Sequence, residues 1–208
     1  MGGIADLFNS LSIIYLLGAG VTVYGLARGW RAFWDDNLTT RDYQLAGGVA
    51  FFLLVPIGVL LHEFGHMLAA WSTGAQVLSL GYFLYWGYVE YIPATSDPLA
   101  EWYIALAGNA FSYFLGIACL LAAVRLRNLR PIVRVVLLQL GILEIVQTLI
   151  LYPLLDLDPN FNGDWEAIYS FRAPIASGIT AVIHVLSLVA FVIFINRNST
   201  VKRLLRGY

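Results

Sequence analysis

Long apolar runs alternate with short polar segments along this chain. Five runs of about 20 or more mostly apolar residues are present, at 9–27, 46–71, 99–124, 133–155 and 173–196. A helix needs about 20 such residues to cross the hydrocarbon core of a bilayer. The pattern therefore predicts an all-α polytopic membrane protein with about five transmembrane helices.

The segment 72–98, after the second run, has a different pattern. Its stretch AQVLSLGYFLYWGYVEYIP is rich in β-branched and aromatic residues, and Gly81 and Gly87 interrupt it. This composition favours short hairpins. The stretch is too apolar for full exposure, and non-helical backbone at membrane depth must be covered by protein or line a water-filled cavity. We therefore expect a partly embedded β-hairpin over 76–92.

The composition agrees with this interpretation. The chain is 60% hydrophobic and 12% charged, whereas soluble domains carry about 25% charged residues. A net charge of -1 provides no basic field for nucleic acid. No soluble segment is long enough to fold alone, so we expect a single integral membrane domain over residues 1–208. The single cysteine, Cys119, excludes an intrachain disulfide.

Basic residues gather at three places in the sequence. Cytoplasmic loops of membrane proteins collect Lys and Arg, and 11 of the 12 basic residues follow the first, third or fifth apolar run. This distribution predicts an external N-terminus and a cytoplasmic C-terminus. The residues are Arg28, Arg31, Arg41, Arg125, Arg127, Arg130, Arg134, Arg197, Lys202, Arg203 and Arg206.

The second apolar run contains an unusual polar stretch, HEFGH at 62–66. Residues i and i+4 of a helix share a face, so His62 and His66 project side by side and Glu63 lies next to the first histidine. This is the H-E-x-x-H pattern, in which two histidines bind zinc and the glutamate acts as general base. Ionisable groups inside a span are costly and by default mark function. We therefore favour a metal site over buried histidines that are satisfied by helix neighbours.

A catalytic zinc needs a third protein ligand and an open coordination position. The fourth apolar run ends on the same side of the membrane as the histidine-bearing half of the second, and it continues into YPLLDLDPNFNGDW. This segment offers Asp156, Asp158 and Asp164 as ligands. The residue type alone does not choose among the three.

Four stretches, in order, resemble the site-2 protease family of intramembrane zinc metalloproteases. They are HEFGH, the glycine-interrupted hairpin segment, ALAGNAFSYFLG, which is similar to A-G-P-x-x-N, and DLDPNFNGDW, which is similar to N-x-x-P-x-x-P-x-D-G. The resemblance covers residues 46–166. Aligning the last motif places Pro159 on its first proline and implies that Asp164 is the third zinc ligand.

The resemblance also implies residues that position the substrate. These are Asn109 and Ser112 in the third motif, Asp156 in the fourth, and Gly81 and Gly87 in the hairpin. The chain departs from the family pattern at five of its positions and keeps the zinc ligands. Asn109 replaces a proline, Ser112 and Asp156 replace asparagines, Asn162 replaces the second proline, and Trp165 replaces the glycine after the ligand.

We therefore expect a zinc-dependent endopeptidase that uses Zn²⁺ and Glu63 to activate water against a peptide bond. Its expected partners are the lipid bilayer and a helix of another membrane protein. That helix would be locally unwound and paired with an edge of the 76–92 hairpin. One alternative is a non-catalytic membrane subunit derived from such proteases, with a structural metal, which the altered turn motif favours. A metal transporter is a third hypothesis, but it would gain nothing from Glu63.

The arginine pattern and the family resemblance imply different positions of the zinc site in the membrane. The arginine pattern places the zinc site in the outer half of the bilayer, whereas the family resemblance implies a site nearer the cytosol. We adopt the arginine pattern, because nearly all basic residues agree with it. The substrate and the oligomeric state are not predicted.

Other polar residues lie in the later spans. Glu144 in the fourth run and His184 in the fifth are expected to lie in the helix bundle with hydrogen-bond partners. They would either pair with each other or support the metal ligands. Pro56 and Gly58, just before the histidines, are expected to bend the second span.

Overall fold

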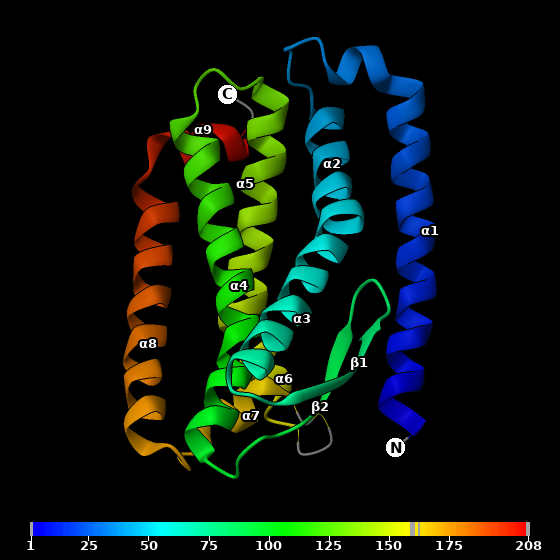
Figure 1. Ribbon diagram of the computed structural model, residues 1–208. Helices are drawn as coiled ribbons and strands as arrows, with labels where there is room; N and C mark the ends of the chain where they lie inside the picture. Colours follow the sequence, from blue (N-terminus) through cyan, green and yellow to red (C-terminus); the bar gives the residue numbers. More distant parts are fainter. Residues whose placement is uncertain (1, 159–160, 162, 207–208) are drawn as a thin grey trace.

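The computed structural model describes residues 2–158, 161 and 163–206. Within this part of the chain, five helical segments are long and apolar enough to cross a membrane (Figure 1). Each overlaps one of the five apolar runs, so the predicted all-α polytopic membrane fold is confirmed. The segments are Ser12–Phe33, Thr40–Ser72, Pro98–Arg125, Pro131–Leu155 and Pro174–Arg197.

Several spans contain more than one helical element. In chain order the elements are α1 Gly2–Phe33, α2 Thr40–Gly48, the π-helix η1 Val49–Leu54, α3 Val55–Ser72, β1 Gln76–Tyr82, β2 Gly87–Ile92, α4 Pro98–Arg125, α5 Pro131–Val146, the π-helix η2 Gln147–Leu151, α6 Tyr152–Leu155, α7 Asp164–Tyr169, α8 Pro174–Arg197 and α9 Ser199–Arg206.

The second span joins α2, η1 and α3 end to end. It begins at a capping box, in which the Thr39 hydroxyl accepts from the N–H of Asp42 and the Asp42 carboxylate accepts from the N–H of Thr39. The π-helix ends just before Val55, and Pro56 occupies the first turn of α3. A proline is tolerated there because the first N–H groups of a helix have no intrahelical acceptor. Pro56, which is expected to bend the second span, therefore lies just after the junction between η1 and α3.

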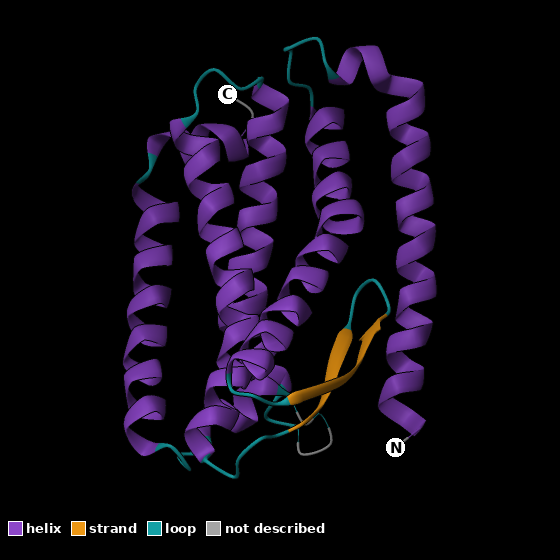
Figure 2. Cartoon of the chain, in the orientation of Figure 1, coloured by secondary structure: helices purple, strands orange, loops and turns teal. Residues whose placement is uncertain are grey.

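The strands β1 and β2 form an antiparallel hairpin, as predicted (Figure 2). The pairing runs from Gln76 opposite Ile92 to Tyr82 opposite Gly87, with one irregularity between Val77 and Ser79. At the hairpin tip, the Tyr82 hydroxyl donates to the carbonyl of Pro56 at 2.7 Å, and Tyr85 donates to Phe52 at 2.9 Å. Both acceptors lie inside the second span, so the hairpin is partly embedded.

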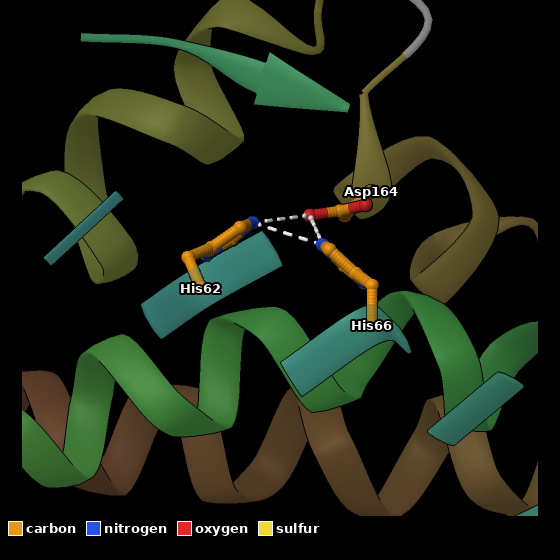
Figure 3. A group of neighbouring side chains, drawn as sticks. All are labelled: His62, His66 and Asp164. Atoms are coloured by element: carbon orange, nitrogen blue, oxygen red, sulfur yellow. Dashed lines mark hydrogen bonds and ion pairs between the residues drawn. The ribbon is translucent and has the colours of Figure 1, made fainter. Parts of the chain in front are cut away.

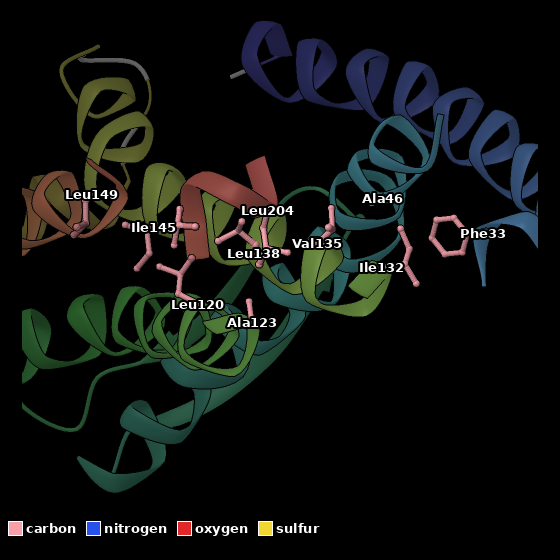
Figure 4. Packing of buried hydrophobic residues seen from close by; sticks show 11 residues of the cluster. Phe33, Ala46, Leu120, Ala123, Ile132, Val135, Leu138, Ile145, Leu149 and Leu204 are labelled. Carbon is pink, nitrogen blue, oxygen red and sulfur yellow. The ribbon is translucent and has the colours of Figure 1, made fainter. Parts of the chain in front are cut away.

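The main hydrophobic core lies between α4, α5 and the ends of their neighbours (Figure 4). Half of the most apolar window of the fourth span is buried, against 6% for the first and fifth spans. The outer faces of α1 and α8 carry exposed side chains such as Leu17, Ile175 and Leu186. Lipid covers such faces in a membrane protein. The core residues are Phe33, Ala46, Leu120, Ala123, Ile132, Val135, Leu138, Ile145, Leu149, Val201 and Leu204.

The basic clusters meet at one end of the molecule. The connection from α1 to α2, the connection from α4 to α5, and helix α9 all lie at the end opposite the N-terminus and α7 (Figure 1). Arg172, the basic residue outside the clusters, belongs to the other end. It pairs there with Glu101 at 2.7 Å. The three groups that are separated in sequence thus form one basic end in space.

Candidate metal centre

Two histidines and one aspartate converge at one place (Figure 3), on the side of the bundle away from the basic clusters. His62 and His66 lie one turn apart on α3, and Asp164 is the first residue of α7. The Oδ2 of Asp164 lies 3.1 Å from the Nε2 of each histidine. The two Nε2 atoms are 3.0 Å apart. All three side chains therefore point their donor atoms at one place.

Asp156 fixes the helix that carries Asp164. Its Oδ2 accepts from the backbone N–H of Trp165 at 2.6 Å and from that of Glu166 at 3.2 Å. These are free N–H groups at the N-terminus of α7, which a carboxylate stabilises. A Cβ at Gly163 would lie 2.0 Å from the Oδ1 of Asp156, so only glycine leaves room for this contact.

Three turn residues, Pro159, Asn160 and Asn162, lie outside the described residues. Two of them, Pro159 and Asn162, belong to the motif alignment. The chain nevertheless folds back after the fourth span, as expected, because Asp164 contacts both histidines of the second span.

The orientation of His66 is set by α4. Its Nδ1 lies 2.7 Å from the carbonyl oxygen of Ile104. A carbonyl only accepts, so Nδ1 carries the hydrogen and the neutral ring presents a lone pair at Nε2. A Cβ at Gly108 would lie 2.2 Å from that Nε2, and glycine is therefore needed for the ring to lie against α4.

His62 is held by a chain of polar side chains. Its Nδ1 lies 3.3 Å from the Oγ of Ser112, and the carboxyl of Glu144 lies close enough to interact with the Ser112 hydroxyl. When the hydroxyl donates to Glu144, it accepts from Nδ1–H, and the Nε2 of His62 is left as a lone pair. Glu144 is 2% exposed. Gly58 makes room for it, since a Cβ there would lie 2.1 Å from Oε1.

Asn109 supports the aspartate directly. Its Nδ2 donates to the Oδ2 of Asp164 at 3.0 Å and to the carbonyl of Ala105 at 3.2 Å. Burial raises the pKa of the Asp164 carboxyl, but a positive charge held at His66 and His62 outweighs this effect and lowers the pKa well below its usual range. A cation between the three side chains therefore keeps Asp164 ionised.

This arrangement fits a divalent metal. Two imidazole nitrogens and one carboxylate oxygen, each with its lone pair directed at the others, repel one another unless a cation or proton lies between them. Ligands of tetrahedral zinc at about 2.0–2.1 Å lie about 3.3 Å apart. The observed separations of 3.0 and 3.1 Å are close to that value. His62, His66 and Asp164 can thus hold a metal ion.

Glu63 lies next to this centre and is 5% exposed. The first residue of β2 covers it, because a Cβ at Gly87 would be 2.6 Å from the Cγ and 2.9 Å from the Oε1 of Glu63. Nine residues of helix separate Glu63 from the end of α3 at Ser72, which corresponds to about 14 Å along the helix axis. The site is therefore inside the span.

The structure brings most of the predicted site residues together. His62, Glu63, His66, Asn109, Ser112 and Asp164 lie in one contiguous group, with Gly87 over Glu63 and Asp156 one step behind Asp164. Gly81 lies elsewhere, opposite Tyr88 in the hairpin, whose ring occupies the place of its side chain. Asp158 is exposed and does not join the histidines.

The pairing of Glu144 with His184 does not form. The Nε2 of His184 donates to the carbonyl of Leu149 at 2.7 Å, and its Nδ1 contacts the Tyr169 hydroxyl. His184 thus connects α8 to α7, whereas Glu144 faces Ser112 and Gly58. Glu144 thus lies beside Ser112, the residue that contacts His62, and its expected support of a metal ligand stays a prediction.

Sequence reasoning missed three contributors to the site. The carbonyl of Ile104 carries no sequence signal, because every residue has one. Gly108 lies within the quoted ALAGN stretch, so its place before Asn109 was a usable signal. Tyr152, in the short helix α6, packs its ring edge-on to His62 with centroids 5.7 Å apart.

The chain was compared with protein families, with curated proteins and with solved structures. None of the three comparisons found a match.

Proposed function

We propose that this protein is an intramembrane zinc metalloendopeptidase that cleaves a transmembrane or membrane-proximal segment of another membrane protein. The convergence of His62, His66 and Asp164 beside the buried Glu63 supports the proposal. A zinc hydrolase uses three protein ligands and leaves one position open for water or substrate. The motif resemblance to the site-2 protease family points in the same direction.

Each residue then has a role in the reaction. His62, His66 and Asp164 would hold the zinc, which when bound supplies a Lewis acid that polarises water and the peptide carbonyl. Glu63 takes the proton from the attacking water and passes it to the leaving amine. Asn109 and Ser112 keep Asp164 and His62 in position.

The hairpin supports a peptide as substrate. A segment in extended form exposes backbone groups that can pair with a strand edge, with no requirement for a particular side chain. The strand β2 starts at Gly87 directly over Glu63, so a peptide added to the edge of the hairpin would run past the base. The helix of the substrate would have to unwind locally for this pairing.

The deciding experiment compares the wild type with Glu63→Gln, both purified in detergent. Each protein is incubated with detergent-solubilised single-span membrane proteins, and new peptide termini are identified by mass spectrometry. We expect both proteins to contain zinc, and termini from the wild type to form at least ~10²-fold faster than from the variant. Chelation should stop the wild type, and added zinc should restore it.

Two results would favour the alternatives. Identical terminus profiles for the two zinc-loaded proteins, without dependence on chelation, would support a non-catalytic subunit with a structural metal. Zinc flux through the wild type in liposomes, without cleavage, would support a transporter.

A further inference from the structure

A groove of about 870 Å³ lies between α1 and the second span, away from the metal centre. Its walls are mostly apolar and include Val21 and Gly25 from α1, Leu45 from α2 and Phe52 from η1. Val21 is 71% exposed. From Gly18 to Arg28, the groove follows α1 for about 15 Å at the helical rise per residue.

Two arginines line the same end of this groove, and Arg28 donates one hydrogen bond there to the Tyr24 hydroxyl at 3.1 Å. Arg28 comes from α1 and Arg41 from α2, and both side chains line the groove. Arg41 reaches back to α1, because its Nη2 would lie 3.5 Å from a Cβ on Gly29, the neighbour of Arg28. Among the described residues, neither arginine forms an ion pair. The nearest carboxylate in sequence, Asp42, is engaged in the capping box with Thr39.

We propose that the groove binds one anionic phospholipid, with the phosphate on Arg28 and Arg41 and an acyl chain against the apolar wall. Arginine is well suited to phosphate because its planar fork donates two parallel hydrogen bonds. Two positive charges without an ion-pair partner at the same end of the groove favour an anionic lipid over a zwitterionic one. Both arginines belong to the basic end of the molecule, and the anionic lipids of a membrane face the cytoplasm.

A substrate helix fits the groove less well. Toward the metal centre, Gly18 lies against the ring of Phe52, and Tyr15 packs edge-on against Phe51 and at a tilted angle against Tyr85. These aromatic contacts close the space between α1 and the second span. The ten residues from Phe52 in the groove to His62 also correspond to about 15 Å along the span between the groove and the metal centre.

The test measures lipid binding to the detergent-purified chain by native mass spectrometry. Phosphatidylglycerol, phosphatidylcholine and inorganic phosphate are titrated separately. The first variant, Arg28→Gln with Arg41→Gln, removes the phosphate ligands. Its matched control, Arg125→Gln with Arg127→Gln, removes the same charge from exposed arginines outside the groove at the same end. A third variant, Val21→Trp, fills the apolar wall without changing charge.

We expect one tightly bound phosphatidylglycerol per chain. Its dissociation constant should rise about tenfold or more in the Arg28/Arg41 variant, because charge-assisted hydrogen bonds are lost. The control should bind as the wild type does, and Val21→Trp should bind more weakly. Phosphatidylcholine and inorganic phosphate should bind less tightly than phosphatidylglycerol.

Four results would overturn the proposal. Equal affinity for phosphatidylglycerol and phosphatidylcholine would show that the groove does not select an anionic lipid. Equal weakening of lipid binding in the Arg125/Arg127 control would show that binding depends on the net charge of this end and not on the groove. Inorganic phosphate binding as tightly as the lipid would mean a site for free phosphate. If Val21→Trp reduced peptide cleavage but not lipid binding, the groove would be a substrate path.

Discussion

Gly87, the first residue of β2, lies directly against the side chain of Glu63. A Cβ on Gly87 would approach the Glu63 Cγ to 2.6 Å, which is closer than real contacts of this kind. The hairpin and the proposed general base therefore share one space, and the absence of a side chain on Gly87 permits it. The hairpin tip is tied to the same span by Tyr82 and Tyr85, so it cannot simply shift away.

A larger residue at Gly87 should therefore impair catalysis. Gly87→Val should displace either Glu63 or the start of β2 and lower turnover by about 10-fold or more, because small misplacements of catalytic groups have large effects. Zinc content should stay near that of the wild type, since no ligand is touched. Gly20→Ala is the control, because a Cβ there meets nothing within 4 Å. Wild-type turnover in Gly87→Val would show that the hairpin does not constrain the base.

Zinc content should depend on the three convergent side chains. The wild type should contain about one zinc per chain, measured by elemental analysis after gentle purification. His62→Ala, His66→Ala and Asp164→Ala should each lose most of it. Asp158→Ala should retain it, because Asp158 is exposed and does not join the histidines. Retention of zinc in Asp164→Ala, with loss in Asp158→Ala, would mean that the wrong acid was assigned.

Asp156 should matter for zinc affinity through the helix that it caps. In Asp156→Ala the backbone N–H groups of Trp165 and Glu166 lose their acceptor, which costs about 1 kcal/mol for a typical N-terminal cap. Asp164 then loses its fixed orientation, and zinc affinity should fall about 10-fold. Asp156→Asn keeps an acceptor oxygen and should retain more of the affinity. Equal zinc affinity in Asp156→Ala and the wild type would show that the turn positions Asp164 without this cap.

The polar chain behind His62 should also tune the metal. Glu144→Leu leaves the Ser112 hydroxyl without its carboxyl partner and should weaken zinc binding about 10-fold. Glu144→Gln keeps a polar acceptor in the space opposite Gly58 and should bind zinc more tightly than Glu144→Leu does. Competition with a chelator of known affinity measures both. Wild-type zinc affinity in Glu144→Leu would show that Ser112 acts without Glu144.

The basic end of the molecule should face the cytoplasm. A reporter fused after Tyr208 should be cytoplasmic, and a tag before Met1 should be accessible from outside. The measurement is the activity of reporters that work on only one side of the membrane. The reverse result would place the metal centre nearer the cytosol, as the family resemblance implies. It would also show that the arginine clusters do not set the topology of this chain.

The sequence by itself determined the spans and the hairpin. Apolar length is a local property, since a bilayer of fixed thickness selects any run of about 20 such residues. The five runs therefore correspond to the five span-length helical segments of the described chain, with ends that agree within six residues. The spacing of His62 and His66 was equally local, because an i and i+4 pair faces one way on any helix.

Only the tertiary structure decided which acid meets these histidines. Asp156, Asp158 and Asp164 lie within nine residues of one another and differ in nothing that local pattern detects. Their distinct roles depend on how the chain returns after the fourth span. Because the chain folds back after the fourth span, Asp164 lies against the two imidazoles. Asp156 instead accepts a hydrogen bond at the N-terminus of α7. The motif alignment favours Asp164, but residue chemistry alone does not.

The supporting contacts also arise from packing between distant helices. Glu144 meets Ser112 because α5 lies against α4, and it fits there because Gly58 on α3 has no side chain. A hydrogen bond between residues on separate spans leaves no periodic trace in the sequence. The role of such a glycine is even harder to predict from the sequence. It makes room for a group on another helix, and that group is known only from the folded structure. The sequence therefore specified the histidine pair, and the folded bundle supplied the third donor atom of the candidate metal centre and the groups that orient all three.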